Sequence, residues 1–117
     1  MTISPARTRP LIAVLSRVPL FVEAMRAAFD GIADVQPVSA DDLGASGLVR
    51  AFHPTAVIVE GIELDGLDLD VPCLRVEIGP GRVSIVSAGV WRPLDIELSP
   101  EAIRNAVVEA LYRGEPA

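Results

Sequence analysis

The chain contains no lysine, and all ten of its basic residues are arginine. The absence of lysine excludes Schiff-base chemistry, a lysine general base and the lysine of a Walker-type phosphate loop. The chain also has only one histidine, His53, and one cysteine, Cys73. A Ser-His-Asp or Cys-His arrangement would have to use His53, and no spaced pair of carboxylates stands out. We therefore expect no catalytic residues, no metal site, no cofactor and no enzymatic activity.

Three residues whose types occur once in the chain, Cys73, His53 and Trp91, have simple structural interpretations. Cys73 lies among apolar residues typical of a strand, which favours a small core residue, and a lone cysteine forms no internal disulfide. His53 precedes Pro54, where a helix would end, and this favours a cation at a helix C-terminus or a polar loop residue. Trp91 would either cover the open side of a sheet or form a contact with a protein partner.

Long hydrophobic runs are also missing, although half of the residues are hydrophobic. The run at 11–15 is too short for a bilayer span or a typical secretory signal. The net charge of −6 disfavours nonspecific binding to nucleic acid, because neutralising phosphates requires a basic face. The 117 residues are enough for one core. We expect a cytoplasmic protein that binds neither membranes nor nucleic acid, with a flexible tail over 1–10 and a single domain over 11–114.

The first part of the domain alternates strands and helices. The apolar run at 11–16 predicts a strand that is buried on both faces. Pro19 suits the first turn of a following helix, and Gly31 is a natural stop after it. A short strand is expected at 34–38, where Pro37 indicates the edge of a sheet. The expected buried face of the helix comprises Phe21, Val22, Met25, Ala28 and Phe29.

A second helix and a central strand should follow. Asp41 and Asp42 are good capping residues at a helix N-terminus, and Pro54 ends the helical pattern. Residues 55–59 are apolar and mostly β-branched, which predicts a central strand parallel to the first. The buried side of this helix is expected to contain Leu43, Leu48, Ala51 and Phe52.

The pattern changes after the central strand. Residues 61–70 are acidic without the spacing of an EF-hand, which predicts a solvated loop. Residues 74–78 alternate apolar and charged side chains, as in a strand with one wet face. A turn at 79–81 and strands at 82–87 and 90–96 predict an antiparallel β-meander.

The last helix is well marked. Ser99 is a good N-cap, and Pro100 and Glu101 suit the first turn. Arg113 and Gly114 favour the helix end. The expected buried stripe consists of Ile103, Ala106, Val107, Ala110 and Leu111.

The order strand, helix, edge strand, helix, central strand resembles the first half of a flavodoxin-like sheet with strand order 2-1-3. Over residues 10–60 and 98–114 the chain looks like a receiver domain of two-component response regulators, including the closing helix. The resemblance implies an α/β three-layer sandwich. The expected fold is therefore a parallel first half followed by the antiparallel meander.

The same resemblance implies phosphorylation of an aspartate at the end of the third strand. It also implies an acidic Mg²⁺-binding pair after the first strand and a lysine after the fifth. In this chain, Glu60 stands at the phospho-acceptor position, Ser16 and Arg17 follow the first strand, and no lysine exists. Because phosphoryl transfer depends on the metal and its charge clamps, the resemblance is to a degenerate receiver that accepts no phosphate.

Two interpretations of Glu60 remain open at this point. Its charge would replace that of a phosphorylated aspartate, with Arg17 nearby, or Glu60 would simply begin the solvated acidic loop. We expect a phosphorylation-independent regulatory module that binds a protein partner or a second copy of itself. The alternative is a small-molecule sensor whose effector binds where Ser16, Arg17 and Glu60 meet, at the carboxyl ends of the strands.

Overall fold

A computed structural model of the chain describes residues 9–39, 45–61, 71–87 and 90–113. The described residues form a mixed α/β fold, which confirms the general class expected from the sequence. The elements are β1 (Leu11–Ser16), α1 (Pro19–Ala28), β2 (Asp34–Ser39), α2 (Ala45–Phe52), β3 (Ala56–Glu60), β4 (Cys73–Glu77), β5 (Arg82–Ser87), β6 (Val90–Leu94) and α3 (Pro100–Arg113).

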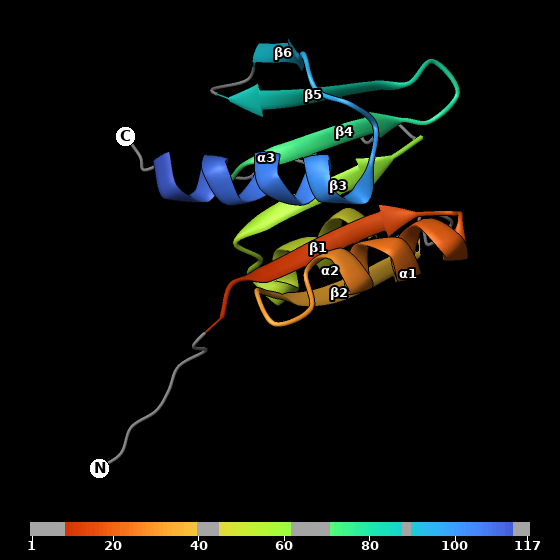
Figure 1. Cartoon of the computed structure of the whole chain (residues 1–117). Helices are drawn as coiled ribbons and strands as arrows, with labels where there is room; N and C mark the ends of the chain where they lie inside the picture. The colour runs from red at the N-terminus through yellow and green to blue at the C-terminus, as the bar shows by residue number, and fades with distance from the viewer. Residues whose placement is uncertain (1–8, 40–44, 62–70, 88–89, 114–117) are drawn as a thin grey trace.

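The strands form one sheet in the order β2-β1-β3-β4-β5-β6 (Figure 1). The strands β2, β1, β3 and β4 run parallel to one another, and β5 and β6 run antiparallel to their neighbours. The parallel part therefore extends one strand further than the three expected from the sequence, and the meander starts from β4. The antiparallel strands depart from the mostly parallel flavodoxin-like order, so the sheet establishes an α/β fold in general terms only.

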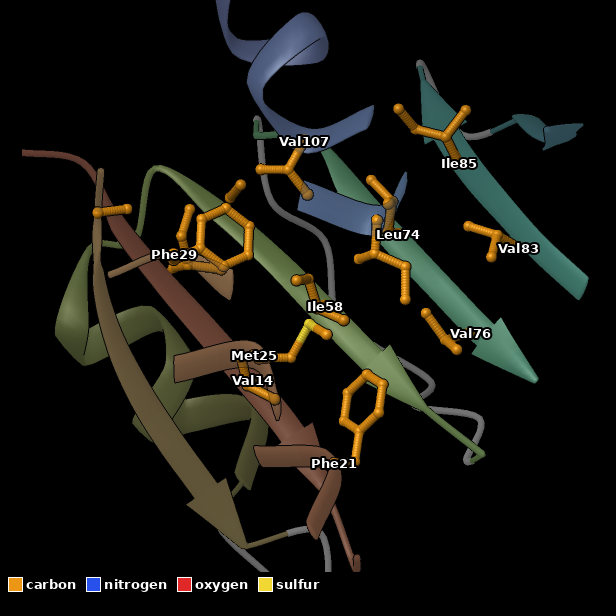
Figure 2. Close-up of a cluster of buried hydrophobic side chains, with 14 residues drawn as sticks. Val14, Phe21, Met25, Phe29, Ile58, Leu74, Val76, Val83, Ile85 and Val107 are labelled. Carbon is orange, nitrogen blue, oxygen red and sulfur yellow. The ribbon is translucent and has the colours of Figure 1, made fainter. Parts of the chain in front are cut away.

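One face of the sheet packs against α1 and α3, which contact each other. Phe21, Met25 and Phe29 recur at helical spacing on one side of α1, and Figure 2 shows them over the strands. Ile103 and Val107 of α3 are also buried, as their spacing predicts. The buried residues of this core are Ile12, Val14, Phe21, Met25, Phe29, Ala33, Ala56, Ile58, Leu74, Val76, Val83, Ile85, Ile103 and Val107.

The opposite face of the sheet packs against α2, so helices lie on both sides. Val49 is the fully buried residue of α2, and Phe52 is partly buried against the same cluster. Ala51 is exposed, so its expected place on the buried side was wrong. Glycines weaken the apolar pattern of this helix, and the pattern therefore placed Ala51 on the buried side and left out Val49. Leu43, Asp41 and Asp42 lie outside the described residues. The sheet residues of this second core are Ala13, Leu15, Val38, Val57, Val59 and Cys73.

The structure confirms the expected cap of the last helix and the expected turn before β5. The Ser99 hydroxyl accepts the Ala102 N–H at 3.1 Å, as an N-cap of α3 should. Gly81 closes the turn before β5 with a φ of +71°, a left-handed conformation that favours glycine. Arg9 pairs with Asp34 at 3.8 Å, so the last residues of the expected tail contact the start of β2. The rest of that tail, over 1–8, lies outside the described residues.

Among the described residues, no helix is both long and apolar enough to cross a membrane.

Candidate functional site

Ser16 and Glu60 are the last residues of β1 and β3, which are parallel neighbours. The pair formed by Leu15 and Val59 comes directly before them, so both side chains lie at the carboxyl ends of adjacent strands. We call this edge of the parallel strands the carboxyl rim. Ser16 is 7% exposed and Glu60 is 8% exposed, and they are the two buried polar residues of the described chain. Buried polar groups require partners, so their contacts determine what the site can do.

The two side chains bond directly to each other. The Ser16 hydroxyl donates to Glu60 Oε1 at 2.6 Å, a length typical of a hydroxyl bonded to a carboxylate. The Ser16 oxygen also accepts the Val18 N–H at 2.9 Å. A serine hydroxyl has one hydrogen and two lone pairs, so Ser16 makes both bonds at once. We call this chain of contacts the Ser16–Glu60 network.

The network connects the end of β3 to the start of α1. Val18 is the N-cap residue of α1 and offers no side-chain cap. Its carbonyl instead accepts the N–H of Phe21 at 3.0 Å. The carboxylate of Glu60 therefore holds Ser16, Ser16 holds the backbone of Val18, and Val18 begins the helix.

The burial of Glu60 shows that one interpretation of this residue was wrong. Glu60 does not begin a solvated loop, because it is the last residue of β3 and pairs with Val76 of β4. Gly61, the next residue, is exposed, and its φ of +69° is left-handed. The Gly61 N–H still donates to the Val76 carbonyl at 2.9 Å, which keeps the strand pairing intact beyond Glu60. The acidic residues at 63–70 lie outside the described residues.

The structure places the other two predicted site residues, Arg17 and Trp91, at two separate locations. Arg17 lies between Ser16 and Val18 in the chain and is itself exposed. Trp91 is not at the carboxyl rim: the register places Cys73, Val86 and Trp91 in one row, at the amino end of β4. There Trp91 lies over Arg75, whose guanidinium carbon is 6.0 Å from the ring centroid. The structure thus brings Ser16 and Glu60 together and keeps Trp91 apart from them.

The chemistry of the rim is that of one carboxylate bonded to one hydroxyl. A Mg²⁺ site of the receiver type would need further oxygen ligands, whereas β1 ends at a serine and the next residue is an arginine. Within the described ranges, no group of three or more histidine, cysteine, aspartate or glutamate side chains could hold a metal ion. Glu60 can therefore act as a fixed acceptor, and the described residues around it supply no metal-assisted chemistry.

The remaining reactive group and the open surface hollow lie away from the network. Burial raises the pKa of the Cys73 thiol from 9.0 to about 11, which keeps the thiol neutral and unreactive near pH 7. An open hollow lies at the other end of β2, between Arg9, Arg26 and Asp30. A sensor site was expected at the carboxyl rim, so this hollow does not correspond to it.

The sequence indicated that Ser16 and Glu60 end neighbouring strands, but it did not indicate that they bond to each other. The signal available was a hydroxyl and a carboxylate at equivalent positions of two apolar strands. Comparison of the chain with protein-family models, with curated proteins and with solved structures found no match of any of the three kinds.

Proposed function

We propose that this chain is a receiver-like regulatory domain that works without phosphorylation. In this proposal, the carboxylate of Glu60 takes the place of a phosphorylated aspartate at the end of the third strand. The observation that carries the proposal is the 2.6 Å bond from the Ser16 hydroxyl to Glu60. It gives a permanent negative charge at that position a dedicated hydrogen-bond donor.

The network supports a permanent regulatory state. In a domain controlled by phosphorylation, the added charge creates new charge-assisted bonds that order a nearby segment. Here the glutamate supplies its charge without modification, and Ser16 passes its effect to Val18 and the start of α1. The absence of any lysine agrees with a site that has no phosphoryl group to bind.

The output of such a domain would reach a protein partner through the surface beside the network. Glu60 is too buried to contact a partner itself. Val18 is 38% exposed and Leu20 is 79% exposed, and both lie where the network fixes the backbone. An exposed leucine at an ordered helix start is a suitable contact for a partner or for a second copy of the chain.

The first test separates this proposal from a phosphate-accepting domain and from a sensor. Thermal unfolding is measured with Mg²⁺ plus beryllium fluoride, a phosphoryl analogue, and with a panel of metabolites. A ligand present at a hundred times its dissociation constant stabilises a fold by about 2.7 kcal/mol, which is several degrees in a domain of this size. We expect no shift. A shift with Mg²⁺ and the analogue would show a phosphoryl site, and a shift with a metabolite would favour the sensor.

The second test asks whether the charge acts as a signal. The variant Glu60→Gln keeps the shape of the side chain and removes its charge. We expect this variant to shift the NMR amide resonances of Arg17 and Val18. In a pull-down, we expect it to lose proteins that the wild-type domain retains. Ser99→Ala removes a hydroxyl that caps α3, so it serves as a control that leaves the network intact. Retention of the same proteins by wild type and Glu60→Gln would refute a signalling role for the charge.

A further inference from the structure

The charge of the chain is distributed unevenly. Residues 73–94 contain three arginines and one glutamate, a net charge of +2. The whole chain carries −6, so the remaining residues carry −8. Arg92 pairs with Ile85 on the face that packs the first core, so the opposite face of the meander carries Arg75, Arg82 and Glu77, a net charge of +1. In an acidic protein, this local positive charge favours approach of a negatively charged ligand.

The register shows which meander residues share a face. Cys73, Val86 and Trp91 are direct neighbours across the three strands. The next row on the same face runs through Arg75, Ser84 and Pro93. Arg82 pairs with Glu77 at the end of this face. We call Arg75, Glu77, Arg82, Ser84, Trp91 and Pro93 the meander face.

The outer part of the meander face is exposed in the described structure. Trp91 is 47% exposed, and the side chain of Arg82 is 65% exposed. Glu77 contacts Arg82 at 3.6 Å and Arg75 at 3.9 Å. The exposed pair with Arg82 contributes little and remains open to exchange. Pro93 is exposed as well. The first core lies on the other face of these strands, where Val83 and Ile85 pack. On the face of Trp91, its neighbours Cys73 and Val86 pack in the second core, and the outer part beyond them is exposed.

The ring of Trp91 lies against the guanidinium group of Arg75. Arg75 lies 6.0 Å from the ring centroid, within the range of a cation–π contact. A large aromatic ring loses little conformational freedom on binding, and tryptophan and arginine are among the residue types that most often dominate binding energy. The combination favours an interaction surface with a defined anchor.

We propose that the meander face binds an extended acidic peptide segment of a protein partner, with Trp91 as the anchor and Arg82 as the main charged contact. An acidic segment is favoured because the rest of this protein would repel it and the meander would attract it. A second copy of the chain is less suited, because two chains of net charge −6 repel each other over most of their surfaces. The proposal does not depend on Glu60.

Trp91 is the only tryptophan, so its fluorescence reports on the meander face alone. The full chain is titrated with a capped oligo-glutamate peptide, which is itself non-fluorescent, and with a capped oligo-glutamine peptide. We expect a saturable change in emission with glutamate, none with glutamine, and weaker binding at high salt. Absence of a change with oligo-glutamate would overturn the proposal. A change in emission on dilution without peptide would identify a second copy as the occupant and would also overturn it.

A matched pair of charge reversals tests the location of the site. Arg82→Glu should weaken oligo-glutamate binding about tenfold, as expected for loss of a central contact. Arg104→Glu makes the same change in net charge on α3, where Arg104 contacts Asn105, and should weaken binding less than about twofold. Equal weakening by both variants would overturn the site and indicate a general charge effect. Glu60→Gln should bind the peptide like wild type, so this result is separate from the proposed function.

Discussion

The variant Ser16→Ala is the most informative perturbation of the carboxyl rim. It removes the donor to a buried carboxylate, a bond worth about 1.5–3 kcal/mol because the acceptor is charged. It also removes the acceptor of the Val18 N–H, which adds about 1 kcal/mol. We therefore expect the free energy of unfolding to fall by about 2.5–4 kcal/mol.

A double-mutant cycle separates the two contributions. Glu60→Met keeps a long unbranched side chain and removes the acceptor. In that background, Ser16→Ala should cost only the Val18 bond, about 1 kcal/mol. The difference between the two backgrounds is the coupling between Ser16 and Glu60, and it should be about 1.5–3 kcal/mol. Urea unfolding followed by circular dichroism measures all four proteins, and an unchanged slope with urea shows that the unfolded state is comparable.

Ser99→Ala provides the control for this cycle. It also removes a hydroxyl that serves a helix start, and should cost about 1 kcal/mol. Because Ser99 shares no partner with Glu60, its effect should add to that of Glu60→Met within about 0.5 kcal/mol. A coupling between Ser16 and Glu60 as small as that of the control would refute the network as an energetic unit.

Three further predictions concern other parts of the fold. Because burial raises the pKa of Cys73 from 9.0 to about 11, the unfolded chain loses this proton first as pH rises. Wild type should therefore lose about 2 kcal/mol of stability between pH 9 and pH 11 that Cys73→Ala does not lose, measured by urea unfolding at each pH. His53→Gly should raise stability by about 0.5–1 kcal/mol, because His53 has a left-handed φ of 52°, whereas His53→Ala should show no gain in the same thermal melts. Ile58→Ala should cost about 2–5 kcal/mol in chemical unfolding because Ile58 is fully buried, while Leu20→Ala on the exposed helix start should change it by less than about 0.5 kcal/mol.

Patterns of residues that lie close together in the sequence predicted the first strand, the first helix and the cap of the last helix. The run at 11–16 and the spacing of Phe21, Met25 and Phe29 depend only on which side chains are apolar, and the structure places these residues in the core. The N-cap at Ser99 is likewise a local matter. In α2 the apolar pattern is weak, so the exposure of Ala51 and the burial of Val49 depend on tertiary contacts that the sequence does not show.

The Ser16–Glu60 network depends on contacts between residues that are far apart in the sequence, so local patterns did not predict it. Glu60 stands next to an acidic stretch, so composition alone indicates a solvated loop. Its burial arises from pairing with Val76 of β4 and from the hydroxyl of Ser16, which is 44 residues away. The same reason explains why the parallel direction of β4 was missed, because strand direction is a property of the assembled sheet. The positions of Ser16 and Glu60 at the ends of neighbouring strands were predictable from the sequence, but the hydrogen bond between them was not.

Both edges of the sheet carry a proline. Pro37 lies within β2 and Pro93 within β6, and these two strands are the outermost ones of the sheet. Proline has no N–H to donate, so neither edge presents an unbroken row of backbone donors. Such edges resist the strand-by-strand growth that leads from a folded sheet to fibrils. The protein can thus expose an aromatic face beside β6 at high concentration without offering that strand as a template for aggregation.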